Sequence, residues 1–189
     1  SQTMSDSTTQ LAPGTSIGSS ATSASDLARL LDSLAFAAGK HRDQRRKGAE
    51  GSPYINHPIA LAALLSMTGG VTDVEVLQAA VLHDTIEDTQ TTREEIAQRF
   101  GERVASIVSE VTDDKSLPKA RRKALQVEHA PQMSLGATLV KLADKTCNLA
   151  DMANAPPAGW QVARIREYFD WASSVVQALP SGNTALRSA

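Results

Sequence analysis

The stretch "LQAAVLHDTIEDTQTT" (residues 77–92) begins as an apolar helix and then places four titratable side chains within six residues. These are His83, Asp84, Glu87 and Asp88. At the 3.6-residue period of an α-helix, His83 and Asp84 continue the apolar stripes that precede them. A buried carboxylate without a partner is strongly destabilising, so Asp84 is expected to be paired or to bind a metal ion. An adjacent His–Asp pair is a common pair of metal ligands. The alternative is a helix end whose polar groups face water.

The remaining hydrophobic periodicity predicts an all-α, single-domain bundle of about eight helices. The other expected helices cover residues 25–40, 56–69, 92–101, 102–111, 118–130, 134–152 and 159–179, and the quoted helix runs from about residue 72 to 83. Residues 1–24 are rich in Ser and Thr and are expected to form a flexible tail. Residues 25–180 form the expected folded domain, and residues 181–189 a C-terminal tail.

Length and composition are those of an ordinary soluble protein. The 189 residues suit one domain with a real core, with 41% hydrophobic and 21% charged residues. A net charge of −2 argues against a general nucleic-acid binder or a membrane-surface binder. One cysteine, Cys147, excludes an intrachain disulfide. No apolar run is long enough to span a bilayer, and no secretory signal is seen, so the expected location is the cytoplasm.

Two further polar residues lie in apolar surroundings elsewhere in the chain. "YINHPIA" places His57 at a helix start, where a lone histidine is more often a capping or packing residue. "LVKLADKTCNLADM" places Asp144 inside an apolar helix, where the simple alternative is a surface ion pair with Lys141. A histidine, a His–Asp pair and an aspartate on three helices together form a much more specific pattern than any one of them.

On these residues the chain resembles the HD-domain hydrolases of the RelA/SpoT class, and most closely the small, stand-alone alarmone hydrolases. The matching segments are "HRDQRRKGAEGSPYINHPIA", "LQAAVLHDTIEDTQTT", "FGERVASIVSEVTDDKSLPK", "LVKLADKTCNLADM" and "GWQVARIREYFDWA". The resemblance implies an all-α HD bundle and one divalent ion per chain, usually Mn²⁺. Its ligands would be His57, His83, Asp84 and Asp144. Two nitrogen and two oxygen ligands also suit such an ion on chemical grounds, without any thiolate.

The resemblance also implies hydrolysis of guanosine tetraphosphate (ppGpp) and pentaphosphate (pppGpp) with release of pyrophosphate from the 3′ position, and no synthetase activity. Glu87 would be the general base and Asp88 its partner. The expected substrate-binding residues are Arg45, Arg46, Lys47, Tyr54, Lys119, Asn148, Arg164 and Tyr168. One departure from the family pattern lies in the helix after "KLAD", where Thr146, Cys147 and Ala150 stand, and it bears on nucleotide selectivity.

Three other functions stay open at this point. The same pocket suits an NADPH 2′-phosphatase, an activity of animal members of the family. A catalytically silent HD module that binds alarmones is a second alternative, which the intact Glu87–Asp88 pair opposes. The third is an RNA binder that uses "HRDQRRK", but aromatic residues for base stacking make up only 4% of the chain. The oligomeric state is not predicted.

Overall fold

The computed structural model of the chain describes residues 24–48, 50–181 and 184–188. Within these residues the chain forms helices and no β-strand, apart from an isolated bridge between Arg45 and Pro53. The prediction of an all-α fold is therefore confirmed. The expected N-terminal tail lies outside the described residues except for Ala24, which begins the first helix.

The eight expected helices are present, and two short helices are added. The elements are α1 (Ala24–Lys40), α2 (Asn56–Met67), α3 (Val74–Leu82), α4 (Thr85–Asp88), α5 (Arg93–Phe100), α6 (Glu102–Glu110), α7 (Lys119–His129), a 3₁₀ turn η1 (Ala130–Gln132), α8 (Leu135–Asn154), α9 (Val162–Ala178) and α10 (Thr184–Ser188). The short additions are α4 and α10. Among the described helices, none combines the length and the apolar character needed to cross a bilayer.

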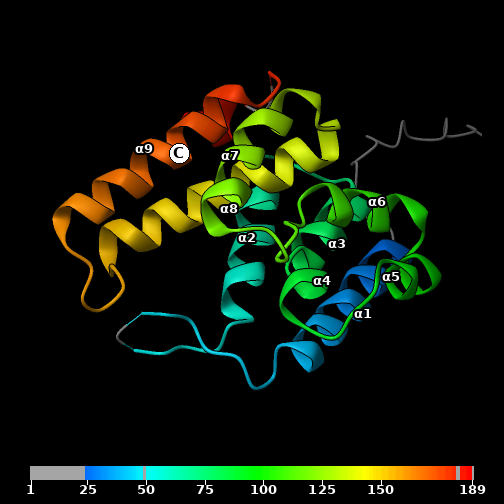
Figure 1. Cartoon of the computed structure of the whole chain (residues 1–189). Coiled ribbons are helices and arrows are strands. Elements are labelled where there is room, and N and C mark those ends of the chain that lie inside the picture. The colour runs from blue at the N-terminus through cyan, green and yellow to red at the C-terminus, as the bar shows by residue number, and fades with distance from the viewer. Residues whose placement is uncertain (1–23, 49, 182–183, 189) are drawn as a thin grey trace, which may run out of the picture.

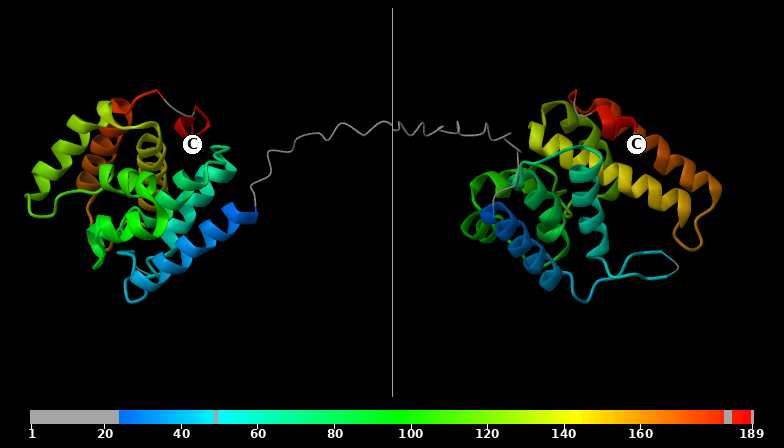
Figure 2. Two further views of the ribbon diagram at one scale, coloured as in Figure 1. Left: turned by 90° about the vertical axis from the view of Figure 1, so that its right-hand side faces the viewer. Right: turned by 180° about the vertical axis from the view of Figure 1, so that it is seen from behind.

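Helix α3 lies at the centre of the bundle. It packs against α1, α2, α6 and α8, and its residues from Val76 to Leu82 are buried. Helices α7, α8 and α9 form a second group on one side, while α1, α5 and α6 lie on the other (Figure 1). The views from the side and from behind show the same division (Figure 2). Helix α8 contacts α9 in its own group and α6 in the other, so it joins the two groups.

Local signals in the sequence explain where several helices begin and end. The side chain of Thr92 accepts a hydrogen bond from the backbone N–H of Glu95 at 3.1 Å, which caps the start of α5. Gly101 follows with φ of 101°, a conformation that favours glycine, and separates α5 from α6. The side chain of Ser134 accepts from the N–H of Ala137 at 3.2 Å and caps α8.

The helix of the opening stretch ends within a residue of its predicted end near residue 83, and the chain turns there. Helix α3 ends at Leu82, and Asp84 has φ of −101° and ψ of 1° before the short helix α4 begins. Glu87 and Asp88 therefore lie on α4 and do not continue the stripes of α3. The break turns the acidic residues relative to α3, so they reach the site from a different direction than one straight helix would give.

The core fixes how α8 sits against the rest of the bundle. Leu61, Leu82 and Leu142 are almost fully buried. A Cβ atom at Gly136 would lie 2.7 Å from the Cδ1 atom of Ile107, so glycine allows α8 to approach α6 closely. This close contact fixes which side of α8 faces α6.

The C-terminal end differs from the expected tail. Residues 181–189 contain α10, which contacts α8, and Leu186 is 1% exposed. Burial of this leucine adds an apolar contact that a tail would not make. The expectation of a tail is corrected to a short packed helix.

Candidate active site

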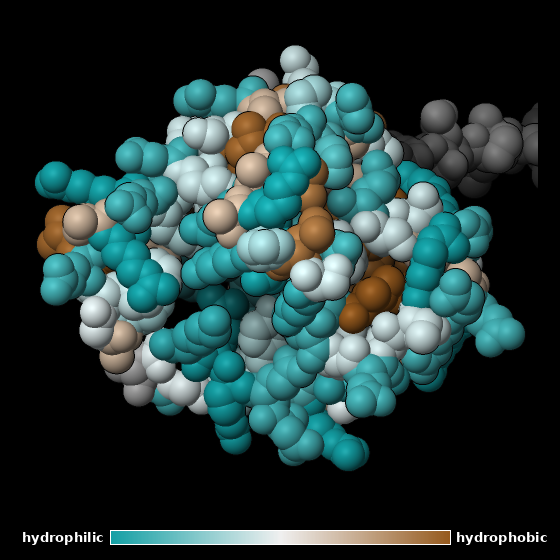
Figure 3. Space-filling model, viewed as in Figure 1, coloured by the Kyte–Doolittle hydropathy of each residue, from teal (hydrophilic) through white to brown (hydrophobic). Residues whose placement is uncertain are grey.

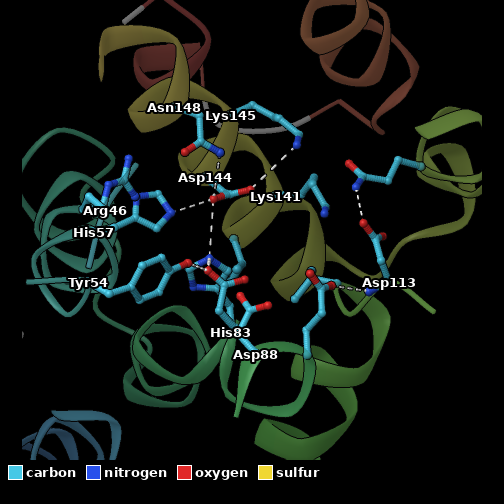
Figure 4. Close-up of a pocket in the computed structure, with 15 residues that line it drawn as sticks. Arg46, Tyr54, His57, His83, Asp88, Asp113, Lys141, Asp144, Lys145 and Asn148 are labelled. Atoms are coloured by element: carbon cyan, nitrogen blue, oxygen red, sulfur yellow. Dashed lines mark hydrogen bonds and ion pairs between the residues drawn. The ribbon is translucent and has the colours of Figure 1, made fainter. Parts of the chain in front are cut away.

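Three helices bring the predicted metal ligands together. His57 lies in the first turn of α2, His83 directly follows α3, and Asp144 lies in the middle of α8. Nε2 of His57 lies 2.9 Å from Oδ1 of Asp144, and Nε2 of His83 lies 3.4 Å from the same oxygen. One ligand atom from each of the three residues lies within 4.8 Å of the others, and these side chains converge in Figure 4.

Asp84, the fourth predicted ligand, adjoins this group. Its Oδ2 atom lies 3.0 Å from Nε2 of His83 and also accepts a hydrogen bond from the hydroxyl of Tyr54. Burial alone would raise the pKa of Asp84, but the neighbouring His83 lowers it to about 2. Asp84 is therefore an ionised carboxylate next to His83, although it lies outside the group formed by His57, His83 and Asp144.

The orientation of His83 shows what this group lacks. Nδ1 of His83 donates a hydrogen bond to the carbonyl oxygen of Ala80 at 2.7 Å. That bond assigns the proton of a neutral ring to Nδ1 and leaves a lone pair on Nε2. This nitrogen is buried, has no hydrogen-bond partner among the described residues, and faces two carboxylates. The Nε2 lone pair of His83 and the carboxylates of Asp84 and Asp144 would repel one another unless a positive charge lies between them.

A proton or a metal ion satisfies that requirement. Burial by itself lowers the pKa of His83, but the carboxylates of Asp84 and Asp144 outweigh it and raise the pKa well above its ordinary value. The same field attracts a divalent ion, for which imidazole nitrogens and carboxylate oxygens are usual ligands. The donor set therefore fits a metal ion.

Glu87 and Asp88 line the same cavity from α4. Oε1 of Glu87 accepts a hydrogen bond from the backbone N–H of Asp113 at 2.7 Å, which fixes the carboxylate. Burial raises the pKa of Glu87 to about 6, against the lowering effect of that hydrogen bond. Asp88 forms an ion pair with Lys115. Of the two acids, Glu87 is thus the one without a cationic partner and the better proton acceptor near neutral pH.

The cavity opens into a larger cleft. It has a volume of about 210 Å³, and the cleft beside it has about 970 Å³. Residues common to both linings are Arg46, Tyr54, Glu87, Asp88 and Asn148. In Figure 3 a hollow lined by hydrophilic residues lies between α8 and the loop that precedes α2. Glu87 and Asp88 thus lie where the cavity meets the cleft, and His57, His83, Asp84 and Asp144 line the cavity alone.

Most of the predicted substrate-binding residues line the cavity or the cleft. They are Arg45, Arg46, Lys47, Tyr54, Asn148 and Tyr168. Arg46 forms an ion pair with Asp151 at the rim, and Asn148 donates a hydrogen bond to Oδ1 of Asp144 at 3.2 Å. Lys119 and Arg164 line neither the cavity nor the cleft, and the Arg164 guanidinium stacks on the Trp160 ring at 3.9 Å. The structure does not bring these two to the site.

Sequence reasoning missed several residues that line the cavity. Gln126 of α7 donates a hydrogen bond to Asp113 at 2.6 Å and so supports the loop that holds Glu87. Lys141 and Lys145 of α8 are each 4% exposed and also line the cavity, so Lys141 is not the surface residue that the ion-pair alternative assumed. Burial lowers the pKa of Lys145 to about 8. The sequence could have indicated this, because residues 141 and 145 are one helical turn apart and lie on the same side of the helix as Asp144.

The residues that depart from the family pattern lie away from the inner site. Cys147 lines neither the cavity nor the cleft, and burial raises the pKa of its thiol to about 11. The hydroxyl of Thr146 donates to the carbonyl oxygen of Leu142 at 2.8 Å. Neither residue touches the metal group, so the departure does not alter the ligand set.

Comparison with known proteins agrees with this geometry. The model of the HD domain family matches residues 33–170. The guanosine-3′,5′-bis(diphosphate) 3′-pyrophosphohydrolase MESH1 of Danio rerio is 59% identical over 86% of this chain and 90% of its own. The enzyme of the same name from Homo sapiens is 56% identical over 87% of this chain and 92% of its own.

A solved structure supports the same conclusion. It is described as a metazoan ortholog of SpoT that hydrolyzes ppGpp, and it superimposes with a TM-score of 0.83 at 46% identity. The superposition covers 85% of this chain and 90% of that one. Agreement in sequence and in fold over nearly the whole of both chains shows that this chain belongs to the HD-domain hydrolases of the RelA/SpoT class.

Proposed function

We propose that this protein hydrolyses guanosine tetraphosphate and pentaphosphate at the 3′ position and releases inorganic pyrophosphate. The observation that carries the proposal is the His83 lone pair that faces two carboxylates in the cavity beside a basic cleft. Relatives that are 56–59% identical over most of their length are named as 3′-pyrophosphohydrolases, which supports the same reaction.

We further propose that the metal ion is Mn²⁺, one per chain, held by His57, His83, Asp84 and Asp144. Two imidazoles make the set too rich in nitrogen for Mg²⁺, which prefers oxygen ligands and retains its waters. When bound, such an ion lowers the pKa of water and withdraws charge from phosphate oxygens. The Tyr54 hydroxyl orients Asp84, and the Ala80 carbonyl orients His83.

Glu87 accepts the proton of the attacking water in this proposal. Its Oε1 atom is held by the Asp113 N–H, which leaves Oε2 to face the cavity without a hydrogen bond to a described residue. The water oxygen forms a bond to the phosphorus attached to the ribose 3′ oxygen, and the bond between that phosphorus and the 3′ oxygen breaks. The 3′ oxygen then takes a proton, which gives pyrophosphate together with guanosine diphosphate from the tetraphosphate or guanosine triphosphate from the pentaphosphate.

The cleft accommodates the rest of the nucleotide. Arg45, Arg46 and Lys47 supply positive charge along one side, and Tyr168 supplies an aromatic ring. Local cations of this kind reconcile a polyanionic substrate with a chain whose net charge is −2. The 3′ end of the substrate then points from the cleft into the smaller cavity, where the acids and the metal ligands lie.

Product identification tests this proposal directly. Metal-loaded protein is incubated separately with guanosine tetraphosphate and with NADPH, and the released phosphorus species are identified by ion chromatography. The expected result is pyrophosphate and guanosine diphosphate from the first substrate. Release of orthophosphate from NADPH alone, with no pyrophosphate from guanosine tetraphosphate, would instead favour the 2′-phosphatase.

A further inference from the structure

Two buried lysines flank the site on one helix. Lys141 and Lys145 lie one turn apart on α8, and each is 4% exposed. Both line the inner cavity. In Figure 4 they lie on the side of Asp144 opposite His57 and Arg46. Buried lysines are rare because removal of an ammonium group from water is unfavourable unless the charge is paired.

The protein itself pairs these charges poorly. No described residue gives the Lys141 ammonium a hydrogen bond or an ion pair. Nζ of Lys145 lies 3.8 Å from Oδ2 of Asp144, which is at the outer limit of an ion pair, and 4.1 Å from the centre of the Trp171 ring. The Trp171 indole N–H donates to the carbonyl oxygen of Lys123 at 3.1 Å, which holds the ring in place. Asp144 is also shared with His57 and His83.

The two lysines are not needed to balance the charge of the acidic residues in the cavity, because those acids have other partners. Five carboxylates line the cavity, but Asp88 is paired with Lys115, Glu87 accepts from a backbone N–H, and Asp113 accepts from the Gln126 amide. The carboxylates of Asp84 and Asp144 face the imidazole of His83, where the proposed metal ion would bind them. The two ammonium groups are therefore left with hydrogen-bonding capacity that points to a bound anion.

The position of the lysines identifies which part of a ligand they would meet. Both line the inner cavity and neither lines the larger cleft, whereas Arg46, Tyr54 and Asn148 line both. A nucleotide that enters through the cleft would reach the metal group first with the phosphate attached to its ribose. A second phosphate, joined to the first, would extend past the metal group toward the two lysines that line the cavity alone.

We propose that Lys141 and Lys145 form a cradle for the terminal phosphate of a 3′-diphosphate, and so select a diphosphate over a single phosphate. This inference rests on the proposed function for the identity of the substrate. Two ammonium groups on one helical face offer six donors, which suits the three oxygens of a terminal phosphate. A nucleotide with a single phosphate on its ribose, such as NADPH, would leave both lysines unpaired and would bind less well.

Binding of inorganic pyrophosphate and orthophosphate tests the cradle without turnover. Each anion is titrated calorimetrically into Mn²⁺-loaded protein from which free metal has been removed. Lys141→Met should weaken pyrophosphate binding about ten- to hundredfold, the range for loss of one charge-assisted hydrogen bond. Orthophosphate binding should change less than about threefold, because one phosphate at the metal group does not need the cradle. Lys141→Arg, which keeps the charge, should recover part of the affinity.

A matched control and a second variant keep the test decisive. Lys40→Met removes a lysine that lines neither cavity nor cleft and instead donates to the carbonyl oxygen of Gln90, so it should leave both affinities unchanged. Lys145→Met decides the outcome if Lys141→Met does not fold. Metal content is measured by elemental analysis in every variant. Pyrophosphate affinity within twofold of the parent, equal losses for both anions, or loss of the metal would each overturn the proposal.

Thermal stability separates a binding role from a structural one. Because Lys141 is buried and unpaired, Lys141→Met should leave the melting temperature of the metal-free protein unchanged or raise it, while it weakens pyrophosphate binding. A structural lysine would show the reverse, with a lower melting temperature and normal binding. If the protein fails to hydrolyse guanosine tetraphosphate, the proposed function fails, but pyrophosphate binding still decides whether the cradle exists.

Discussion

Replacement of Glu87 by Gln separates proton acceptance from every other role of this side chain. Glutamine keeps the length and shape, and its amide oxygen can still accept the hydrogen bond from the Asp113 N–H that the carboxylate now accepts at 2.7 Å. The capacity to take a proton is lost, together with the negative charge. A positioned general base contributes about 10²–10⁴-fold to the rate, so kcat should fall by that factor. KM should change little, provided that chemistry limits turnover.

The same variant has a stability signature that follows from the raised pKa. A shift of the Glu87 pKa from 4.5 to about 6 corresponds to roughly 2 kcal/mol. Screening by solvent at this half-buried carboxylate reduces the figure to about 1 kcal/mol. Because the folded state raises the pKa, ionised Glu87 destabilises the folded protein above about pH 6, and that effect disappears below pH 4.5. Glu87→Gln should therefore raise the melting temperature at pH 8 by about 2–4 °C and leave it unchanged at pH 4.

Steady-state kinetics on metal-loaded protein and thermal denaturation of metal-free protein measure the two effects. In the parent, kcat/KM should fall about tenfold per pH unit below about pH 6, and this acid limb should disappear in the variant. Glu94→Gln is the matched control, since Glu94 is an exposed acid on α5 that lines neither cavity nor cleft. A kcat within a few-fold of the parent, with metal content verified, would refute Glu87 as the base and make Asp88 the next residue to test.

The remaining predictions concern the metal. Chelation should abolish hydrolysis, and Mn²⁺ should restore it better than Mg²⁺ because two ligands are imidazoles; equal activity of metal-stripped protein in Mg²⁺ alone would contradict this. Asp144→Ala should lose the metal and keep its helical circular dichroism, and a stoichiometric ion found by elemental analysis would show that the other ligands suffice. Tyr54→Phe removes the hydrogen bond that orients Asp84 and should weaken metal affinity about 10–100-fold in a competition assay with a chelator.

The sequence singled out His57, His83 and Asp144 because each interrupts an apolar segment, and their grouping as metal ligands came from the resemblance to the family. His57, His83 and Asp144 all follow or occupy buried helix faces, where a polar side chain requires a partner. Periodicity predicted the helices for the same reason, since each of the longer ones buries an apolar stripe. It did not predict the turn at Asp84, which places Glu87 and Asp88 on the separate short helix α4.

The parts of the site that sequence could not predict depend on contacts between distant elements. The support of Glu87 comes from the loop at Asp113, and that loop is held in turn by Gln126 of α7. No local pattern links these three positions. Lysines are also read as surface residues by default, so only the packing of α9 over α8 shows that Lys145 lies beneath Trp171.

Both proposals depend on which side of α8 faces the cavity. A helix turns about 100° per residue, so residues three, four and seven positions apart share one side. Lys141, Asp144, Lys145 and Asn148 satisfy that relation and all line the cavity. The close approach of Gly136 to Ile107 fixes this orientation from the far end of the helix. In the two proposals, one packed helix therefore carries the metal ligand Asp144, the Asn148 amide that hydrogen-bonds to it and both ammonium groups, so a change in the rotation of α8 would displace all of them together.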